Sequence, residues 1–276
     1  MKTVLVTGAN GYMGRHVVTE LLKQNYRVLA SDFLFDGVDE RAVRVEEPIF
    51  SGAEDIFEKL GKPDVCVHLA WRNGFVHNAD SHICDLPQHF EFLKNMIAGG
   101  LKQVAVMGSM HEVGYWEGAI DETTPCSPKS MYGIAKNALR QCLFSLPGIE
   151  NVCVQWLRAY YILGDDLHSN SIFSKIVKME SEGAEKFPFT TGKNLYDFIT
   201  IDELARQIAL TVDQKEVTGI INCCTGLPMS LADKVEEFIK EHEFKIKLEY
   251  GVFPDRPYDS PGVWGNSDKI NEILGK

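Results

Sequence analysis

The sequence predicts an α/β fold in which helices cover both faces of a doubly wound parallel sheet. Three observations support this prediction: apolar runs of strand length, helical patterns between them, and their alternation through the first 160 residues. Strands that alternate with helices at this spacing form βαβ units, and such units build parallel sheets. After about residue 160 the alternation ends, and a smaller C-terminal lobe is expected.

The elements of the sheet part follow from apolar periodicity and from the turn residues that end each run. Residues 3–7 form a short β-branched strand closed by Gly8, and residues 12–23 follow as a helix with apolar residues on one side. Further strands are predicted over residues 26–30, 42–45, 65–70, 103–107 and 152–157, and further helices over 52–60, 87–98 and 127–144.

The chain after residue 160 is predicted to form mainly a lobe with short helices, and the return of one strand to the sheet stays open. Turn residues dominate residues 187–193, and Gly and Pro recur over residues 255–265. Residues 234–245 mix charges around apolar positions, which predicts a solvated amphipathic helix. We expect the lobe to pack over the carboxyl ends of the strands, where ligands of such sheets bind.

Composition and charge argue against several classes of protein. With 45% hydrophobic and 24% charged residues, the chain of 276 residues has an ordinary globular composition. A formal net charge of -11 argues against nucleic-acid binding, because phosphate backbones favour basic surfaces. No run approaches the ~20 apolar residues of a membrane span, so no membrane association is expected.

The cysteines and the first residues indicate a cytoplasmic protein. Seven cysteines are scattered without a Cys-x-x-Cys pair, which favours free thiols in a reducing compartment. The apolar run after Met1 ends at Gly8, too early for a secretory signal. His77, His82 and His89 are spaced irregularly, so no metal site is expected.

A glycine-rich turn lies between the first strand and the first helix. Gly8 permits the tight turn, Gly11 lets a pyrophosphate approach backbone N–H groups, and Gly14 lets helix and strand pack closely. The helix N-terminus adds partial positive charge for the phosphates. Residues 1–160 are therefore predicted to be a dinucleotide-binding domain whose turn contacts the cofactor through Gly8, Asn10, Gly11, Tyr12, Met13 and Gly14.

Asp32, at the end of the second strand, indicates which dinucleotide binds. A carboxylate at this position accepts hydrogen bonds from both adenosine ribose hydroxyls and repels a 2′-phosphate. NAD is therefore the expected cofactor. NADP remains the alternative, because Arg15, Arg41 and Arg44 are candidates for contacting a 2′-phosphate.

Three residues form a candidate proton-transfer group. Tyr132 and Lys136 are four residues apart and share one helix face. A neighbouring ammonium and a positively charged nicotinamide are expected to lower the pKa of the tyrosine, which is near ~10 when unperturbed. Lys136 can also hold the nicotinamide ribose. Ser109, at the carboxyl end of the fifth strand, can hydrogen-bond a reacting carbonyl oxygen.

These motifs resemble those of the extended short-chain dehydrogenases/reductases, in the nucleotide-sugar epimerase/dehydratase/reductase family. The resemblance covers nearly the whole chain. It implies a Rossmann-like fold with a C-terminal substrate lobe, catalytic roles for Ser109, Tyr132 and Lys136, and a homodimer. The segment His68-Leu69-Ala70 resembles the strand end that passes the nicotinamide, which adds Leu69 and Ala70 to the cofactor contacts.

Departures from the family pattern narrow the expected chemistry. The sugar dehydratases of the family carry an Asp-Glu pair just after the catalytic hydroxyl, and Met110-His111 stand there in this chain. Dehydration is therefore not expected. The residues around Ser109 most resemble reductases that act on 4-keto-6-deoxy sugars linked to a nucleoside diphosphate.

Four residues are candidate substrate contacts, two from the resemblance and two from their own position or chemistry. Arg158 and Tyr161 fall in a segment that resembles a later substrate-lobe motif, with Tyr161 in place of the usual Asn. His111 follows the catalytic hydroxyl closely, although a structural hydrogen bond is its alternative role. Arg256 is suited to clamp a pyrophosphate through its bidentate guanidinium, unless it is a surface residue.

The expected function is NAD(P)-dependent reduction of the 4-keto group of a nucleoside-diphosphate 6-deoxy sugar, in the synthesis of deoxysugar precursors of surface polysaccharides. A nucleotide-sugar 4-epimerase with retained NAD is the nearest alternative. A catalytically silent, dinucleotide-binding regulator is an alternative of another class, and the presence of Ser109, Tyr132 and Lys136 argues against it.

Overall fold

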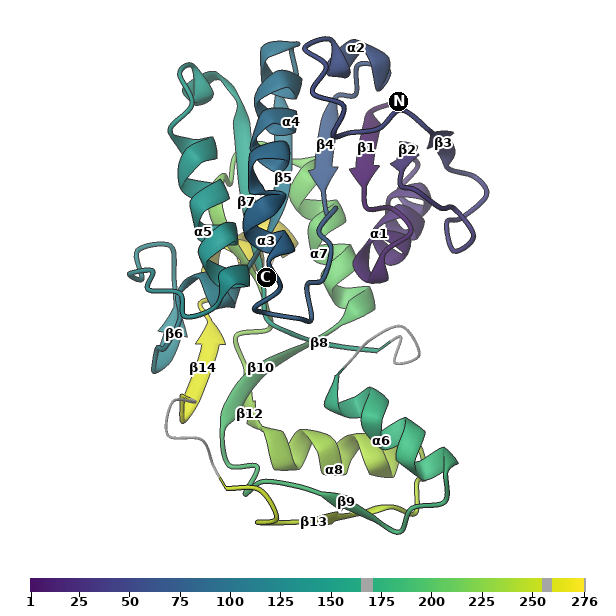
Figure 1. Ribbon diagram of the computed structural model, residues 1–276, viewed down its shortest axis with the longest axis vertical. Helices are drawn as coiled ribbons and strands as arrows, with labels where there is room; N and C mark the ends of the chain where they lie inside the picture. The colour runs from purple at the N-terminus through teal and green to yellow at the C-terminus, as the bar shows by residue number, and fades with distance from the viewer. Residues whose placement is uncertain (165–170, 255–259, 276) are drawn as a thin grey trace.

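The computed structural model describes residues 1–164, 171–254 and 260–275, which form a sheet unit above a smaller lobe in the view of Figure 1. Among these residues, one sheet has seven strands in the order β11, β7, β5, β4, β1, β2, β3. All neighbouring pairs are parallel. The strands are β1 (Thr3–Thr7), β2 (Arg27–Ser31), β3 (Val43–Val45), β4 (Val65–His68), β5 (Gln103–Ser109), β7 (Cys153–Ala159) and β11 (Gly219–Cys223). The order runs outward from β1 in both directions, which confirms the doubly wound α/β prediction.

Both faces of this sheet are covered by helices. Successive residues of a strand point to opposite faces, so the buried residues of each strand need cover on both sides. Val4 and Val6 of β1 belong to one apolar core, and Leu5 between them belongs to another. The first core is shared with α1 (Tyr12–Lys23), α7 (Ile201–Asp213) and α9 (Asp268–Leu274). The second is shared with α2 (Ile56–Lys59), α4 (Leu86–Ala98) and α5 (Met131–Phe144), and α3 (Ser81–Cys84) lies against α4 and α5.

The lobe contains its own core, and two smaller sheets lie outside the large one (Figure 1). Its core joins Phe173 and Ile176 of α6 (Ile172–Ser181) to Val235 and Phe238 of α8 (Leu231–Glu241). The strands outside the large sheet are β6 (Gly118–Ile120), β8 (Tyr161–Leu163), β9 (Lys186–Pro188), β10 (Leu195–Thr200), β12 (Pro228–Ser230), β13 (Lys247–Glu249) and β14 (Gly262–Gly265). Two short 3-10 helices are η1 (Met110–Glu112) and η2 (Ile149–Asn151).

Residues after 160 contribute to both parts of the molecule. Strand β11 joins the large sheet beside β7, and α7 and α9 share the core on one of its faces. The chain therefore crosses between the two parts more than once (Figure 1).

Several boundaries differ from the sequence-based prediction. The helix expected over 52–60 is only α2, and the helix expected over 127–144 begins at Met131, because Ser130 caps it by accepting a hydrogen bond from the Gly133 N–H at 3.2 Å. The turn-rich stretch 187–193 begins within β9, which pairs with β13. The described end of the Gly- and Pro-rich stretch 255–265 is a strand, β14, because it pairs with β6 and β10.

Candidate active site

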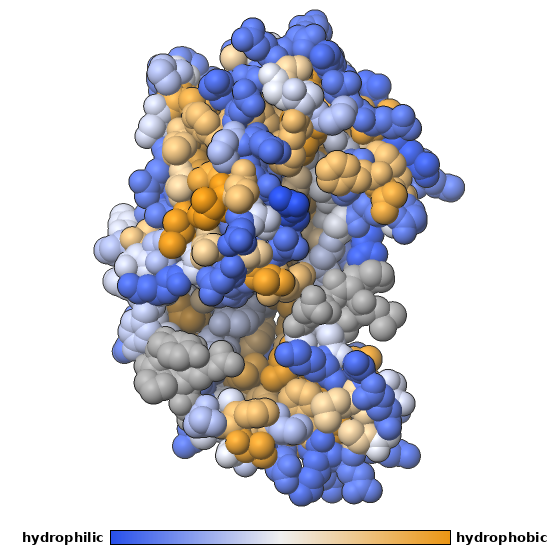
Figure 2. Space-filling view, in the orientation of Figure 1, coloured by the Kyte–Doolittle hydropathy of each residue, from blue (hydrophilic) through white to orange (hydrophobic). Residues whose placement is uncertain are grey.

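A cavity of about 1130 Å³ opens at the carboxyl ends of β1, β2, β4, β5 and β7 and extends toward the lobe. Figure 2 shows apolar side chains in the recess between the two parts of the molecule. Most of the residues singled out in the sequence line this one cavity. They are Gly8, Gly11, Tyr12, Met13, Gly14, Asp32, Leu69, Ala70, Ser109, His111, Tyr132, Lys136 and Tyr161.

The glycine turn fits a ligand that needs close contact with the backbone. Gly8 has φ +70°, and a Cβ there would lie 2.7 Å from the backbone nitrogen of Ala70. A Cβ on Gly14 would lie 2.0 Å from the carbonyl oxygen of Gly8, so only glycine permits this packing. A Cβ on Gly11 meets only the carbonyl oxygen of Gly8, at 3.1 Å, and this residue lines the cavity at the start of α1. The turn therefore has the shape of a pyrophosphate cradle.

Replacing Gly11 by Ala is expected to weaken NADH binding about tenfold or more while leaving the fold intact. Its φ of -72° suits any residue, but the new methyl group would occupy the path of the pyrophosphate to the N–H groups. Loss of one hydrogen bond to a charged group removes ~1.5–3 kcal/mol, and ~1.4 kcal/mol is a tenfold change in Kd. Calorimetric titration with NADH measures the effect. Gly74→Ala, which places a methyl group in open space at the rim of the cavity, is the control. Equal affinities of the two variants would contradict the expectation.

Asp32 is held in place by backbone groups of its surroundings. Its carboxylate accepts hydrogen bonds from the N–H of Asn10 at 2.8 Å and from the N–H of Phe33 at 2.7 Å. The side chain of Asn10 bonds to Asp36 at 2.9 Å and to the Gly37 N–H at 2.8 Å. Asn10 thus braces the turn and the Asp32 loop, and it does not line the cavity.

The three arginines considered for a 2′-phosphate have other contacts. Arg41 forms a bidentate pair with Asp39, with N–O distances of 3.0 and 2.7 Å. The guanidinium of Arg44 lies over the ring of Phe35, 5.6 Å from its centroid. Arg15 donates to the carbonyl oxygen of Gly11 at 3.4 Å and lines a different cavity. This arrangement favours NAD over NADP.

Ser109, Tyr132 and Lys136 meet at the inner end of the cavity. Helix α5 approaches η1 so closely that a Cβ on Gly133 would lie 2.3 Å from the carbonyl oxygen of His111. This contact brings Tyr132 close to Ser109, whose hydroxyl acts to lower the pKa of Tyr132. Lys136 is buried one turn further along α5, and its Nζ donates to the carbonyl oxygen of Met107 at 2.7 Å.

Burial dominates the acid–base properties of this group. It raises the pKa of Tyr132 to about 12, against the opposing effect of the Ser109 hydrogen bond. It lowers the pKa of Lys136 to about 7, with the charge of Glu112 acting in the opposite sense. Without a cofactor, desolvation therefore raises the tyrosine pKa, and the lowering expected from Lys136 together with an oxidised nicotinamide stays a prediction.

Glu112 holds the backbone of Ser109 in place, a role that the sequence did not indicate. Its fully buried carboxylate accepts hydrogen bonds from the Ser109 N–H at 2.7 Å and from the Trp156 Nε1–H at 2.9 Å. The guanidinium of Arg158 lies 3.4 Å from the same carboxylate and bonds to the Asp121 carbonyl oxygen at 3.0 Å. The structural role of Glu112 becomes visible only from its buried partners in the folded chain.

One of the candidate substrate contacts does not line the cavity. The assignment of Arg158 is corrected: its side chain is fully buried and paired with Glu112, so it serves the structure behind Ser109. Arg256 lies outside the described residues. His111 and Tyr161 line the cavity, and the ring of Tyr161 packs 4.2 Å from that of Tyr196.

A group of histidines surrounds Tyr132. The ring of His77 stacks on Tyr132 with centroids 5.6 Å apart, and His111 lies 4.4 Å from His77. Deeper in the protein, the His68 Nε2 and His89 Nδ1 atoms are 2.9 Å apart. Burial lowers the pKa of His111 to about 4 and that of His89 to about 3. These side chains are therefore neutral at pH 7.

The buried histidines predict a loss of stability in mild acid. A histidine with a folded pKa below its unfolded value of ~6.5 binds its proton only after unfolding, so its contribution is lost as the pH falls between those values. For His89 this amounts to about 1.4 kcal/mol per pH unit below ~6.5. Urea unfolding at pH 7 and pH 5 measures the slope, which we expect to be smaller in His89→Gln. An unchanged slope would contradict this assignment.

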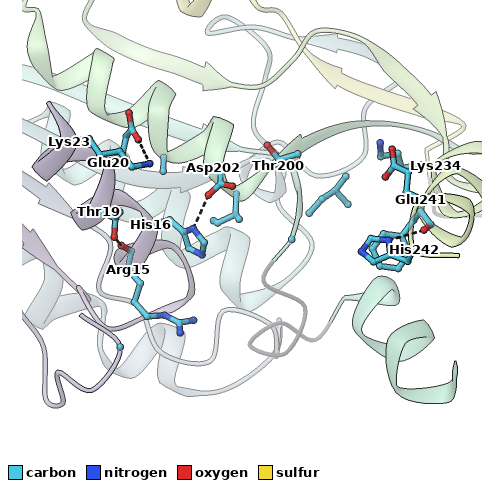
Figure 3. Close-up of a pocket in the computed structure, with 16 residues that line it drawn as sticks. Arg15, His16, Thr19, Glu20, Lys23, Thr200, Asp202, Lys234, Glu241 and His242 are labelled. Carbon is cyan, nitrogen blue, oxygen red and sulfur yellow. Dashed lines mark hydrogen bonds and ion pairs between the residues drawn. The ribbon is translucent and has the colours of Figure 1, made fainter. Parts of the chain in front are cut away.

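A second cavity of about 810 Å³ lies between α1, the start of α7 and α8 (Figure 3). Its polar side chains carry mixed charges, and His16 Nδ1 lies 3.1 Å from Asp202 Oδ1. Lys234, Glu241 and His242 face them from the lobe (Figure 3). Apart from Arg15, which was considered for a 2′-phosphate, none of the described candidate catalytic, cofactor or substrate residues lines this cavity.

Two further features concern the described residues only. No helix in residues 1–164, 171–254 and 260–275 has the length and apolar character needed to cross a bilayer. Within the same ranges, no three His, Cys, Asp or Glu side chains are grouped as they would be around a metal ion.

Comparison with known proteins identifies the family. Residues 4–224 match the NAD dependent epimerase/dehydratase family. The chain is 46% identical over 271 residues to dTDP-6-deoxy-L-talose 4-dehydrogenase (NAD(+)) of Aggregatibacter actinomycetemcomitans, covering 95% of this chain and 98% of that protein. It is 25% identical to UDP-arabinose 4-epimerase 1 of Arabidopsis thaliana, over 98% of this chain and 74% of that protein.

Solved structures show the same fold. A UDP-glucose-4-epimerase from Stenotrophomonas maltophila, with bound NAD and formylated UDP-arabinopyranose, superposes with a TM-score of 0.85 at 17% identity. The superposition covers 100% of this chain and 93% of that one. The match over residues 4–224 and the 46% identity confirm the resemblance recognised in the sequence, and the chain belongs to the NAD dependent epimerase/dehydratase family.

Proposed function

We propose that this protein is an NAD-dependent oxidoreductase that interconverts the 4-keto and 4-hydroxy forms of a nucleoside-diphosphate 6-deoxy sugar. The observation that carries the proposal is the meeting of Ser109, Tyr132 and Lys136 in the cavity that also contains the glycine turn. The 46% identical relative, named as a dTDP-6-deoxy-L-talose 4-dehydrogenase (NAD(+)), supports the choice of sugar class and of cofactor. By its name, a thymidine-linked sugar is the first substrate to test.

NAD fits the part of the cavity that the glycine turn and Asp32 line. The glycine turn and the N-terminus of α1 take the pyrophosphate, and Asp32 takes the adenosine ribose. Leu69 and Ala70 lie where the turn closes against the end of β4. Lys136 points into the inner end, where it can hold the second ribose.

The chemistry at the inner end divides among three side chains. Bound NADH supplies a hydride to C4 of the sugar. The Tyr132 hydroxyl supplies the proton to the C4 oxygen, and Ser109 holds that oxygen through a hydrogen bond. The Lys136 ammonium stabilises the Tyr132 phenolate that remains, until solvent returns a proton to it. In the oxidation, the phenolate of Tyr132 takes the proton from the C4 hydroxyl.

The surroundings of Ser109 support oxidoreduction and not dehydration. Met110 and His111 stand where a dehydratase needs an acid and a base. Met110 is buried, and the low pKa of His111 keeps its imidazole neutral. We propose that His111 and Tyr161 contact the sugar as neutral groups, and that the lobe binds the nucleotide part.

A 4-epimerase is the second candidate function, because one of the reported relatives and the solved structure carry that name. An epimerase oxidises and re-reduces the same carbon and keeps its NAD. The purified protein would then carry tightly bound dinucleotide and show no net change in NADH.

The direct assay mixes the purified protein with dTDP-4-keto-6-deoxy sugar and either NADH or NADPH. We expect loss of absorbance at the reduced nicotinamide band with NADH. Since Asp32 repels a 2′-phosphate, NADPH should react much more slowly. No consumption of either cofactor, with thymidine-, uridine-, guanosine- and cytidine-linked sugars, would reject the proposal.

We further propose that the protein acts in the cytoplasm as a homodimer. The seven cysteines are free thiols, which suits a reducing compartment. Met131 and Ile134 of α5 and Ile83 of α3 are exposed apolar side chains on neighbouring helices. Light scattering after size-exclusion chromatography tests the dimer, and a monomer mass at micromolar concentration would reject it.

A further inference from the structure

Lys136 lies against an indole ring that the family motifs do not explain. Its Nζ atom is 3.7 Å from the ring centroid of Trp71 and 5.9 Å from that of Tyr132. The carbonyl oxygen of Met107 accepts one of its hydrogen bonds at 2.7 Å. Because Lys136 is almost fully buried, the face of Trp71 replaces water on one side of the ammonium group.

Trp71 is fixed by two histidines. Its Nε1–H donates to Nδ1 of His82 at 3.0 Å, and Nε2 of His82 lies 2.9 Å from the carbonyl oxygen of Val76. A carbonyl oxygen only accepts, so Nε2 carries the proton and His82 is held as one neutral tautomer. On the other side, the indole stacks on His89 with centroids 4.4 Å apart and planes inclined by 21°.

The loop that carries Trp71 is tied to helix α4. Arg72 forms a bidentate pair with Asp85, just before the helix begins. His82 belongs to α3 and His89 to α4, so the indole is held between the end of β4 and these two helices. The position of the ring is therefore set by the fold and not by Lys136.

We propose that Trp71 is a positioning residue for Lys136: its indole face stabilises the ammonium form and keeps Nζ beside Tyr132, and His82 fixes the indole. The proposal rests on the function proposed above, since the ammonium matters there for proton transfer through Tyr132. The indole attracts the Lys136 ammonium without carrying a negative charge. It therefore does not compete, as an anion would, with the Tyr132 phenolate for Lys136.

The other groups that face Lys136 leave this role to Trp71. His68 on β4 and His89 on α4 are neutral, because burial and the nearby Lys136 charge both lower their pKa values. Glu112 on η1 raises the pKa of Lys136, but its carboxylate is already engaged by Ser109, Trp156 and Arg158. Tyr132, on the same helix, is uncharged when its pKa is about 12.

The test measures the titration of Lys136 in the protein without cofactor or sugar. The ¹³Cε signal of Lys136 is assigned by its absence in Lys136→Met and followed from pH 5 to pH 10. A desolvated cation–π contact is worth up to ~2 kcal/mol, so Trp71→Leu should lower the Lys136 pKa by on the order of one unit. Trp71→Phe keeps an aromatic face and should restore most of the shift.

Matched variants separate this role from a structural one. Trp116→Leu removes another indole whose Nε1–H is bonded, to the Ala119 carbonyl oxygen at 3.0 Å, and should leave the Lys136 titration unchanged. If Trp71→Leu does not fold, His82→Leu carries the test, because it removes the acceptor of the indole N–H and should also lower the Lys136 pKa. The alkaline limb of kcat/KM should also move to lower pH.

An unchanged Lys136 titration in the folded Trp71→Leu variant would overturn the proposal, as would equal shifts in Trp71→Leu and Trp71→Phe. This result is independent of the assigned reaction, since no sugar is present. If the NMR shift occurs but no sugar is reduced, the role of Trp71 in stabilising Lys136 stands and the proposed function fails.

Discussion

Replacing Tyr132 by Phe is expected to lower kcat for sugar reduction by about 10²- to 10⁴-fold. The substitution removes the hydroxyl that gives its proton to the C4 oxygen and leaves the ring packed against His77. Steady-state rates with NADH and the 4-keto sugar measure the loss. Calorimetric titration should show NADH binding close to that of the unsubstituted protein, because the glycine turn and Asp32 are untouched.

Tyr115→Phe is the matched control for this prediction. Tyr115 is exposed and bonds through its hydroxyl to Glu117, away from the cavity lining. Its loss should leave kcat unchanged. A Tyr132→Phe variant that keeps more than a tenth of the activity would show that another group donates the proton.

Glu112→Leu is expected to destabilise the protein by about 3–5 kcal/mol, the usual effect of removing one partner of a buried ion pair. The substitution leaves the fully buried Arg158 without its carboxylate and the Trp156 N–H without an acceptor. It also frees the Ser109 backbone, so kcat should fall as well. Urea unfolding at pH 7 gives the change in the free energy of unfolding.

The double variant Glu112→Leu with Arg158→Met tests the cause of that loss. If the unpaired charge of Arg158 is responsible, removing it should recover a large part of the lost stability. Additive losses in the double variant, or a loss below ~1 kcal/mol in Glu112→Leu alone, would contradict the described network.

Local patterns predicted much of the sheet unit. Residues 3–7 and 12–23 form the strand and helix expected of them, because short β-branched runs and one-sided apolar periodicity depend little on distant residues. The glycine turn was equally readable, since the packing of the turn itself requires glycine at Gly8 and Gly14. The prediction of its dinucleotide function agrees with the family match over residues 4–224.

Features that depend on distant pairing were missed. Strands β6 and β14 have three and four residues and lie far apart in the chain. They form strands only because they pair with each other, and β14 also pairs with β10. No local periodicity marks such short segments.

The contacts of the side chains around the candidate active site were also not predictable from local patterns. Motif resemblance placed Arg158 near the substrate, whereas its pairing with Glu112 depends on how η1 packs on β7. Likewise, the spacing of His82 and His89 carries no signal by itself. Their relation to Trp71 arises because the loop after β4 folds back over α3 and α4.

Transfer of deuterium from nicotinamide-labelled NADH to the sugar tests the central claim most directly. The 4-keto sugar is incubated with the protein and NADH deuterated on the transferring face of C4, and the product is analysed by NMR. The account predicts one deuterium at C4 of the sugar for each NADH oxidised, and no product from Tyr132→Phe on the same timescale. Deuterium at another carbon, or oxidation of NADH without deuterium at C4 of the sugar, would contradict it.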